Sequence, residues 1–577
     1  MHQFSSKGCA DLDARPVHGR RRARAASPLP FLLGVCAAVL ALTSLGASPA
    51  AAQGMTFSLE ESGQSTAKSN TPPSQTLAHA LQLYQAERYD EAAVQFERVV
   101  DGQTKDAPGN VEQAQFFLGK ALFHERFYQS ALNLFDLISK VGPKHRYYNQ
   151  SLEWLAQLAQ RLPESAGIID RVGRYGVGAL EQFNTPEQAS LYHELLYLMG
   201  RHRYRQGELD DAVELFSKIP ITAARYVEAQ FFIGVTQVRL HHARPAIAAF
   251  RHILDAIRRG QVRGPVDQSR MRNLAWLSLA RVYYTAANET DPATGETHVD
   301  GRLLGQAVES WDQVQQSSEY WLDAEFESSW AFFLADEYAR ALGNIHTIFS
   351  PYFEDAYYPE ALVVKAVTFF VNCQIDNAEA TIGQFHERYD QVRDELEAKL
   401  GSFEDNTQFF EFLRAVRAGK ADLSPRLRGI VSTAIGDRTV LRNLAYVDEL
   451  DEEQARLQRA PKELQRSAVG ARILQDTALA KSFAVDATGD LVRARYARLL
   501  RDLQDLTNQM DTIELEIATY QRGQLNQSVQ AQMSRAQRSK GGNVQVDDEH
   551  QLWPFDGEYW RDELGFYRQQ VTNVCTR

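Results

Sequence analysis

The sequence predicts an all-α protein, in which a solenoid of stacked helical pairs is followed by a region of long helices. Two observations carry this prediction. Small and large apolar residues recur in one frame, at a step of about 34 residues, through residues 76–390. A strict apolar heptad pattern then runs from Val492 to Tyr520. One helical pair cannot bury its apolar face alone, whereas stacked pairs share a continuous core.

Residues 1–52 are expected to be a cleavable signal peptide. A basic stretch, "GRRRARAASPLP", precedes an apolar segment that begins at Phe31, and Ala50–Ala52 fits an A-x-A cleavage site. A retained membrane anchor is the alternative, and the short apolar segment disfavours it. Residues 53–75 are polar and predict a disordered leader. No later apolar run is long enough to span a membrane, so we expect no span in the mature chain.

The charge argues against a nucleic-acid partner. The whole chain carries a formal net charge of -12, and removing six basic and two acidic residues with the signal peptide leaves -16. Two cysteines remain, Cys373 and Cys575. In an oxidising compartment they could form one disulfide that pins the tail onto the repeats. The alternative is two unpaired thiols.

The repeat is clearest in "QFFLGKALFHERFYQSALNLFDLISKVGP", which begins at Gln115. Its small residues Gly119 and Ala131 let two antiparallel helices approach closely, and large residues such as Phe135 fill the space around them. The same frame recurs further along, and Gly200 and Gly234 are 34 residues apart. This pattern resembles the tetratricopeptide repeat. We expect about eight helical pairs over residues 76–390, with one degenerate pair at 147–183 and a turn-rich insertion, "ANETDPATGETHVDG".

Residues 391–540 are predicted to form long helices. Their apolar seam has the 4-3 spacing of a coiled coil and consists of Val492, Tyr496, Leu499, Leu503, Leu506, Met510, Ile513, Ile517 and Tyr520. It could pair within the chain against a weaker stripe at 437–470, formed by Val440, Leu444, Val447 and Leu457, or form a homodimer. Internal pairing is favoured because that stripe lies nearby. Gly541-Gly542 then breaks the helix and opens the final segment, 541–577.

Signals for catalysis are scarce, so no enzyme activity is predicted. The sequence has no nucleophile elbow, zinc-protease motif, phosphate-binding loop or C-x-x-C. "DDEH" at Asp547–His550 contains residues able to bind a metal, but consecutive side chains seldom converge without a dedicated loop. We therefore expect no catalytic residue, metal or cofactor. An enzyme confined to the C-terminal 190 residues remains the rival reading, and it would need a polar pocket with converging carboxylates and His550.

Binding is the function that such a solenoid usually supplies, through a concave surface lined by the first helix of each pair. Candidate groove residues combine positive charge with aromatic surface, which suits an extended peptide or helix of some acidic character. They are Lys120, Phe123, His124, Arg201, Tyr204 and Trp330. The alternative is that several of them only pack within the repeats. The chain lacks the Lys and Asn set with which tetratricopeptide domains clamp a C-terminal carboxylate.

The C-terminal stretch "WPFDGEYWRDELGFY", residues 553–567, is rich in aromatic and acidic residues. We expect it to fold back as a clasp that covers an apolar face, with a turn at Asp556-Gly557 and a short helix after it. A partner-docking motif is the main alternative, and a catalytic site is the weakest. The aromatic residues that would serve the clasp or the docking motif are Trp553, Phe555, Tyr559, Trp560 and Phe566.

Two stretches carry a closer resemblance. "YYPEALVVKAVTFFVNCQIDNAEATIGQFHERYD", from Tyr357, and residues 553–567 resemble exported tetratricopeptide proteins of myxobacteria, some of which belong to the adventurous gliding motility machinery. The resemblance implies a non-enzymatic scaffold, periplasmic or outer-membrane-associated, that binds other envelope proteins. The chain departs from an anchored member in lacking a lipidation cysteine. A periplasmic chaperone for outer-membrane or lipoprotein clients is the alternative.

Overall fold

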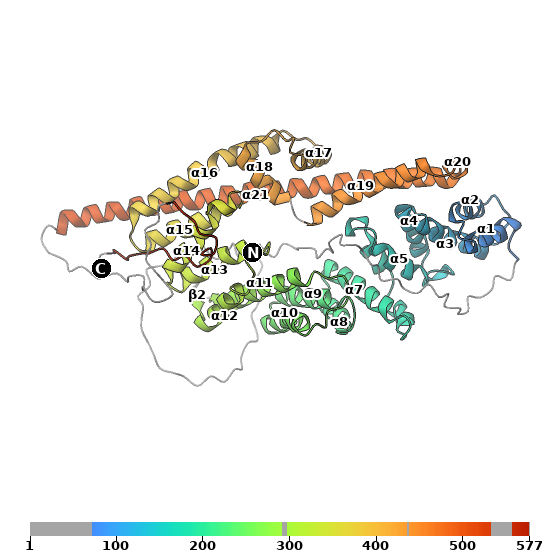
Figure 1. Cartoon of the computed structure of the whole chain (residues 1–577), viewed down its shortest axis with the longest axis horizontal. Helices are drawn as coiled ribbons and strands as arrows, with labels where there is room; N and C mark the ends of the chain where they lie inside the picture. Colours follow the sequence, from blue (N-terminus) through green and yellow to red (C-terminus); the bar gives the residue numbers. More distant parts are fainter. Residues whose placement is uncertain (1–71, 291–296, 436–437, 532–556, 576–577) are drawn as a thin grey trace, which may run out of the picture.

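The computed structural model describes residues 72–290, 297–435, 438–531 and 557–575. The predicted signal peptide, almost all of the leader, Asp547–His550, Trp553 and Phe555 lie outside these residues. The described chain is all-α apart from one hairpin of two short strands, β1 (Asn288–Thr290) and β2 (Thr297–Val299). Figure 1 shows an elongated molecule, with the early repeats at one end and α14 to α16 towards the other.

Eight helical pairs make up the solenoid over the described residues, as the sequence predicts. The pairs are α1 (Gln75–Gln85) with α2 (Tyr89–Val100), α3 (Pro108–His124) with α4 (Tyr128–Val141), α5 (Ser151–Ala159) with α6 (Ile168–Gly173), α7 (Ala189–Gln206) with α8 (Leu209–Ser217), α9 (Tyr226–Arg239) with α10 (Ala243–Arg258), α11 (Gln268–Ala287) with α12 (Gly301–Trp311), α13 (Trp321–Leu334) with α14 (Tyr338–Ile348), and α15 (Pro359–Val371) with α16 (Ile375–Gly401).

The third pair is the degenerate one. Its helices are short, and single 3-10 turns fill the space around them. These turns are η1 (Gly142–Lys144), η2 (Glu164–Ala166), η3 (Val177–Ala179) and η4 (Glu181–Phe183), and a fifth, η5 (Pro351–Phe353), follows α14. The predicted insertion between α11 and α12 contains the β-hairpin.

In three of the pairs a glycine of the first helix packs against a phenylalanine ring of the second helix. A Cβ atom on Gly119, Gly200 or Gly234 would lie 2.9, 2.7 or 2.6 Å from the ring of the phenylalanine sixteen residues later. Those rings, Phe135, Phe216 and Phe250, are buried. The first helix therefore needs a glycine here because the aromatic ring of the second helix lies directly against its backbone.

The turns inside the pairs also repeat. In five of them a residue other than glycine has positive φ, and the residues are Glu87, Arg126, His241, Asp336 and Cys373. Gly207 occupies the same place in the α7–α8 turn. At each turn the amide of the next residue donates to a carbonyl five positions earlier, as in the bond from Gln374 N to Phe369 O at 2.9 Å. This is the Schellman ending of a helix, which reverses the chain within three residues.

The C-terminal region is a set of packed helices. It consists of α17 (Asn406–Arg417), α18 (Pro425–Ile435), α19 (Arg438–Arg459), the single turn α20 (Lys462–Gln465) and α21 (Ala468–Ala531). The predicted boundary at residue 390 is not a break, because α16 runs through it to Gly401. Among the described residues, none of the helices combines the length and apolar character needed to cross a membrane.

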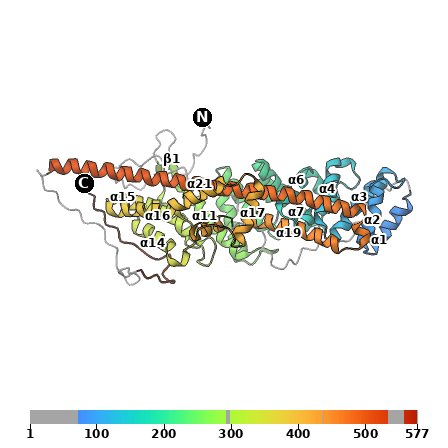
Figure 2. The same ribbon diagram turned by 90° about the horizontal axis from the view of Figure 1, so that it is seen from above.

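The longest helix, α21, has 64 residues and extends about 96 Å at 1.5 Å per residue. It contacts α2 and α4 near its start and α15 and α16 further along. Figures 1 and 2 show it running along the length of the molecule beside the solenoid. The second helical pair and the last pair, far apart in the sequence, are thus joined by one rod.

The heptad seam of α21 is buried from Val492 to Ile517, and it is buried by the same chain. Its partners differ from the predicted stripe. The seam packs on α16 and α17, where the rings of Phe412 and Tyr496 are 5.8 Å apart. Helix α19 pairs instead with the first part of α21, where Lys481 bonds Asp451 at 2.5 Å, because the short α20 link folds α19 back onto it. A homodimer through this seam would require the internal contacts to open.

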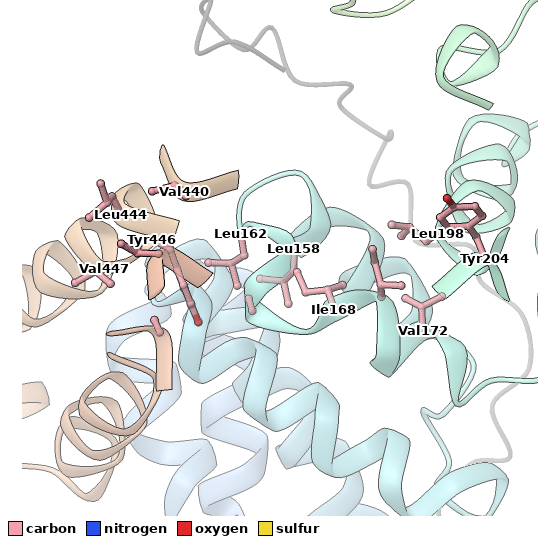
Figure 3. Packing of buried hydrophobic residues seen from close by; sticks show 14 of the residues in the cluster. Leu158, Leu162, Ile168, Val172, Leu198, Tyr204, Val440, Leu444, Tyr446 and Val447 are labelled. Carbon is pink, nitrogen blue, oxygen red and sulfur yellow. The ribbon is translucent and has the colours of Figure 1, made fainter. Parts of the chain in front are cut away.

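Helix α19 also meets the early repeats, through Tyr446 and Glu453, which both bond Gln129 of α4. Figure 3 shows Val440, Leu444, Tyr446 and Val447 of α19 on the side of the core that also holds Leu162. All of these residues are buried and belong to one apolar cluster. Helix α19 therefore contacts the solenoid as well as α21.

Candidate functional site

The predicted groove residues of α3 lie half-buried in an aromatic cluster. The Lys120 ammonium is 5.2 Å from the ring centre of Trp154, and the Phe123 and Trp154 rings are also 5.2 Å apart. His124 stacks on Tyr89 at 4.4 Å. Burial and the Lys120 charge lower the pKa of His124, which favours a neutral ring. These side chains join the first three helical pairs, so their charge and aromatic surface are largely used inside the fold.

Arg201 and Tyr204 on α7 are buried, which corrects their expected place on an open groove. The Arg201 guanidinium lies 4.3 Å over the ring of Phe232 and donates to both carboxylate oxygens of Glu164 at 2.7 Å. The next helical pair supplies Phe232 and covers both residues. A side chain on the first helix of a pair is therefore inaccessible to a partner protein where the following pair packs over it.

Trp330 on α13 is also engaged with the next pair. Its indole N–H donates to Glu360 Oε1 at 3.1 Å, and burial raises the pKa of Glu360 to about 7. A similar link joins α11 to α13, where Arg281 donates to Glu327 at 2.9 Å. The polar residues of successive first helices thus hold neighbouring pairs in register.

The C-terminal helices attach to the early repeats through buried polar groups. Glu453 of α19 accepts from the backbone N–H of Gln129 at 3.2 Å, and the Tyr446 hydroxyl donates to the Gln129 side chain at 2.5 Å. Burial raises the pKa of Glu453 to about 8. Arg472 of α21 pairs with Glu97 of α2 at 2.7 Å. These contacts fix α19 and α21 against the second helix of each of the first two pairs.

The C-terminal segment crosses α14, with turns over residues 561–566 and an extended course after them. The amide of Gly565 donates to Thr347 Oγ1 at 3.0 Å, and the amide of Gln569 donates to the carbonyl of Ala339 at 3.0 Å. A Cβ on Gly343 would lie 1.6 Å from the carbonyl oxygen of Tyr567. The segment is held mainly by its backbone on a surface that a glycine leaves open. The predicted short helix is absent from residues 557–575.

The side chains that anchor this segment match the predicted set only in Tyr559. Tyr559 stacks on His346 at 4.6 Å, and Leu564 is only 3% exposed within an apolar cluster. Burial lowers the pKa of His346 to about 4. By contrast, Trp560 is 49% exposed and Phe566 is 74% exposed. The segment therefore combines a clasp, through Tyr559 and Leu564, with aromatic surface turned outward.

The segment ends at the turn between α15 and α16. Here the sulfur atoms of Cys373 and Cys575 are 2.09 Å apart, at bonding distance. The Tyr520 hydroxyl of α21 lies 3.4 Å from the Cys373 sulfur, and the amide of Val574 donates to Asn372 O at 3.1 Å. The C-terminal segment and the end of the α21 seam thus both contact the turn of the last helical pair.

No cluster of three or more His, Cys, Asp or Glu side chains suited to a metal ion is found in the described parts of the chain. The described part of the chain is an arrangement of packed helical pairs and long helices. Its chemistry is that of holding other chains through side-chain contacts.

Comparisons with known proteins add no evidence about a role. No protein-family model matches the sequence, and no curated protein matches it. Among solved structures, the apo form of RapI is similar over 63% of this chain and 98% of its own, with 11% identity and a TM-score of 0.29. A circular tandem repeat protein with a novel repeat topology is similar over 77% and 96%, with 12% identity and a TM-score of 0.11. By its own structure, the chain is a helical repeat protein.

Proposed function

We propose that this chain is a non-enzymatic periplasmic scaffold that binds other proteins of the cell envelope. The observation that carries the proposal is the rod α21, which contacts the first two pairs and the last pair of the solenoid. Repeat solenoids bind partners along extended surfaces. Because α21 contacts both ends of the solenoid, it fixes the curvature of that surface. The predicted signal peptide and the cysteine pair support export to an oxidising compartment.

A gliding-motility complex is the finer form of the proposal. It rests on the resemblance of residues 357–390 and 553–567 to exported tetratricopeptide proteins of myxobacteria. Attachment to the outer membrane would then occur through partners, since the residue directly after the predicted cleavage site is Gln53 and not a cysteine that could be lipidated.

A pull-down from solubilised envelopes with the chain from residue 53 tests the proposal. Stoichiometric recovery of envelope proteins is expected, and recovery of no partner would contradict it. A variant lacking residues 553–577 separates the two roles of the tail. A clasp loses thermal stability on deletion, whereas a docking motif leaves stability intact and loses the partner.

A periplasmic chaperone is the second candidate, and an exposed apolar pair on α21 favours it. Leu479 is 55% exposed and Phe483, one turn later, is 66% exposed. Exposed apolar surface of this kind can hold unfolded clients. A chaperone would suppress aggregation of an unfolded outer-membrane protein, and replacing both residues by serine would abolish this. Unchanged aggregation in the presence of the wild-type chain would remove this candidate.

A further inference from the structure

A cleft of about 710 Å³ opens where the connections between successive pairs meet the C-terminal helices. Its walls are the start of α13, the segment 351–358 after α14, and α18. A second hollow of about 460 Å³ adjoins it and shares Asp355 and Thr433. None of the predicted groove residues lines either hollow.

The cleft is acidic. Four carboxylates line it, Glu319, Asp323, Glu354 and Asp355, and these described lining residues include no lysine, arginine or histidine. Glu319 is matched by Arg270 at 2.6 Å and Arg438 at 3.9 Å, and Arg428 lines the adjoining hollow. Glu354 and Asp355 are exposed at the mouth, so their negative charge faces solvent.

Asp323 is the deepest of these carboxylates. Its Oδ1 accepts from the Tyr358 hydroxyl at 2.8 Å. Burial raises the pKa of Asp323 although Arg281 lies near enough to oppose the shift. Desolvation of this carboxylate is thus only partly offset within the chain, and a cation entering the cleft would offset more of it.

The cleft is also aromatic. Tyr352, Phe353, Tyr357 and Tyr358 line it together with a few aliphatic groups. The Tyr357 hydroxyl is buried and has no hydrogen-bond partner within the described residues. Aromatic faces beside carboxylates recognise cations by combining the ring quadrupole with charge-assisted hydrogen bonds.

The C-terminal segment extends this surface. The Tyr352 hydroxyl donates to the Tyr559 carbonyl at 3.3 Å, so the segment passes along the rim of the cleft. Next to Tyr559 lie the half-exposed ring of Trp560 and the exposed carboxylates of Asp562 and Glu563, with the exposed Arg561 between them. The surface available to a partner therefore continues from the cleft onto the C-terminal segment.

We propose that this cleft binds an arginine side chain presented by a basic segment of a partner protein. A guanidinium is planar and weakly hydrated, stacks on tyrosine rings and donates to two carboxylate oxygens at once, which suits these walls better than a compact ammonium. The inference rests on the proposed function and names the chemistry of the partner.

The test uses the chain from residue 53 and a short fluorescent arginine-rich peptide, followed by anisotropy at near-physiological ionic strength. The same peptide with citrulline in place of arginine keeps the shape and removes the charge. The cleft variant is Asp323→Asn with Asp355→Asn. Its matched control is Asp210→Asn with Asp211→Asn, which removes two exposed carboxylates of α8 and changes the net charge equally.

We expect the cleft variant to weaken binding about tenfold or more, the control to change it less than about twofold, and the citrulline peptide not to bind. Asparagine at 323 can still accept from Tyr358, and thermal unfolding of the variant checks that the fold is kept. Equal losses in both variants would show general attraction to an acidic chain and overturn the proposal. So would equal binding of the citrulline peptide.

The envelope pull-down keeps this inference separate from the proposed function. If the cleft variant recovers the same partners in the same amounts, the scaffold stands and the cleft is not its arginine site. If the wild-type chain recovers no partner while the cleft binds the peptide specifically, the scaffold fails and the site remains.

Discussion

Glu453 makes the attachment of α19 to the early repeats depend on pH. The side chain is fully buried, and burial raises its pKa from an ordinary 4.5 to about 8. Between these two values the folded chain keeps a proton that the unfolded chain has released. Stability is therefore lost as pH rises through this window.

The size of the effect follows from the shift. Each pH unit inside the window is worth about 1.36 kcal/mol. Glutamine at this position keeps an acceptor for the Gln129 amide and has no proton to lose. Between pH 5 and pH 7 the free energy of unfolding of Glu453→Gln should rise by about 2 to 3 kcal/mol relative to wild type.

Urea unfolding followed by circular dichroism at pH 5, 6, 7 and 8 measures this difference. Burial also raises the pKa values of other acids, such as Glu325 and Glu360. Their contributions to the pH dependence of stability are the same in the variant and in wild type, so they cancel in the difference. Glu452→Gln, the exposed neighbour, is the control and should leave the pH profile unchanged. Parallel profiles for Glu453→Gln and wild type would refute the reasoning.

Three further predictions concern the repeats and the tail. Gly343→Ala should displace the tail from α14, because the new methyl would collide with the Tyr567 carbonyl. Limited proteolysis should then cut the tail. The control is Gly383→Ala, which places its methyl in open space and should leave the tail protected. Gly234→Ala should cost about 1 to 3 kcal/mol by pressing on the Phe250 ring, with partial recovery by Phe250→Leu; an unchanged melting temperature would contradict the contact. Cys575→Ser should lose about 5 kcal/mol of stability in the chain-entropy model, since the disulfide closes a loop of 202 residues. A free thiol at Cys373 in wild-type protein purified from the periplasm, found by non-reducing peptide mapping, would rule the disulfide out.

The solenoid could be predicted from sequence because its key contacts are local. Gly200 and Phe216 meet within one pair, so their spacing in the chain already encodes the contact. The clearest pairs therefore stand out even without related sequences. The degenerate third pair is weaker in sequence because it uses short helices and 3-10 turns in place of the glycine contact.

Partners that lie far apart in sequence could not be predicted in the same way. A heptad pattern shows that one face of a helix is apolar, and it does not show which helix covers that face. This is why the sequence favours pairing of the α21 seam with residues 437–470, although the seam packs on α16 and α17. The sequence pattern also predicts Arg201 and Tyr204 on a groove, because only the structure of the next pair shows that they are covered.

The tail illustrates a related limit. Its aromatic content indicates contact with something, but not which rings face inward. The inward side chain that sequence reasoning missed is Leu564, the only leucine between Leu552 and the chain end. An isolated aliphatic residue in a stretch of aromatic and charged residues was the available signal for an anchor.

The rod α21 changes how the ends of the solenoid behave. In an open array of repeats the terminal pair has one neighbour and frays before the rest. Here α2 and α4 near the start, and α16 at the far end, have the same helix as a second neighbour. Local opening at one end must then weaken contacts that also stabilise the other. We therefore expect the whole array to unfold as one cooperative unit, since its two ends share a neighbour.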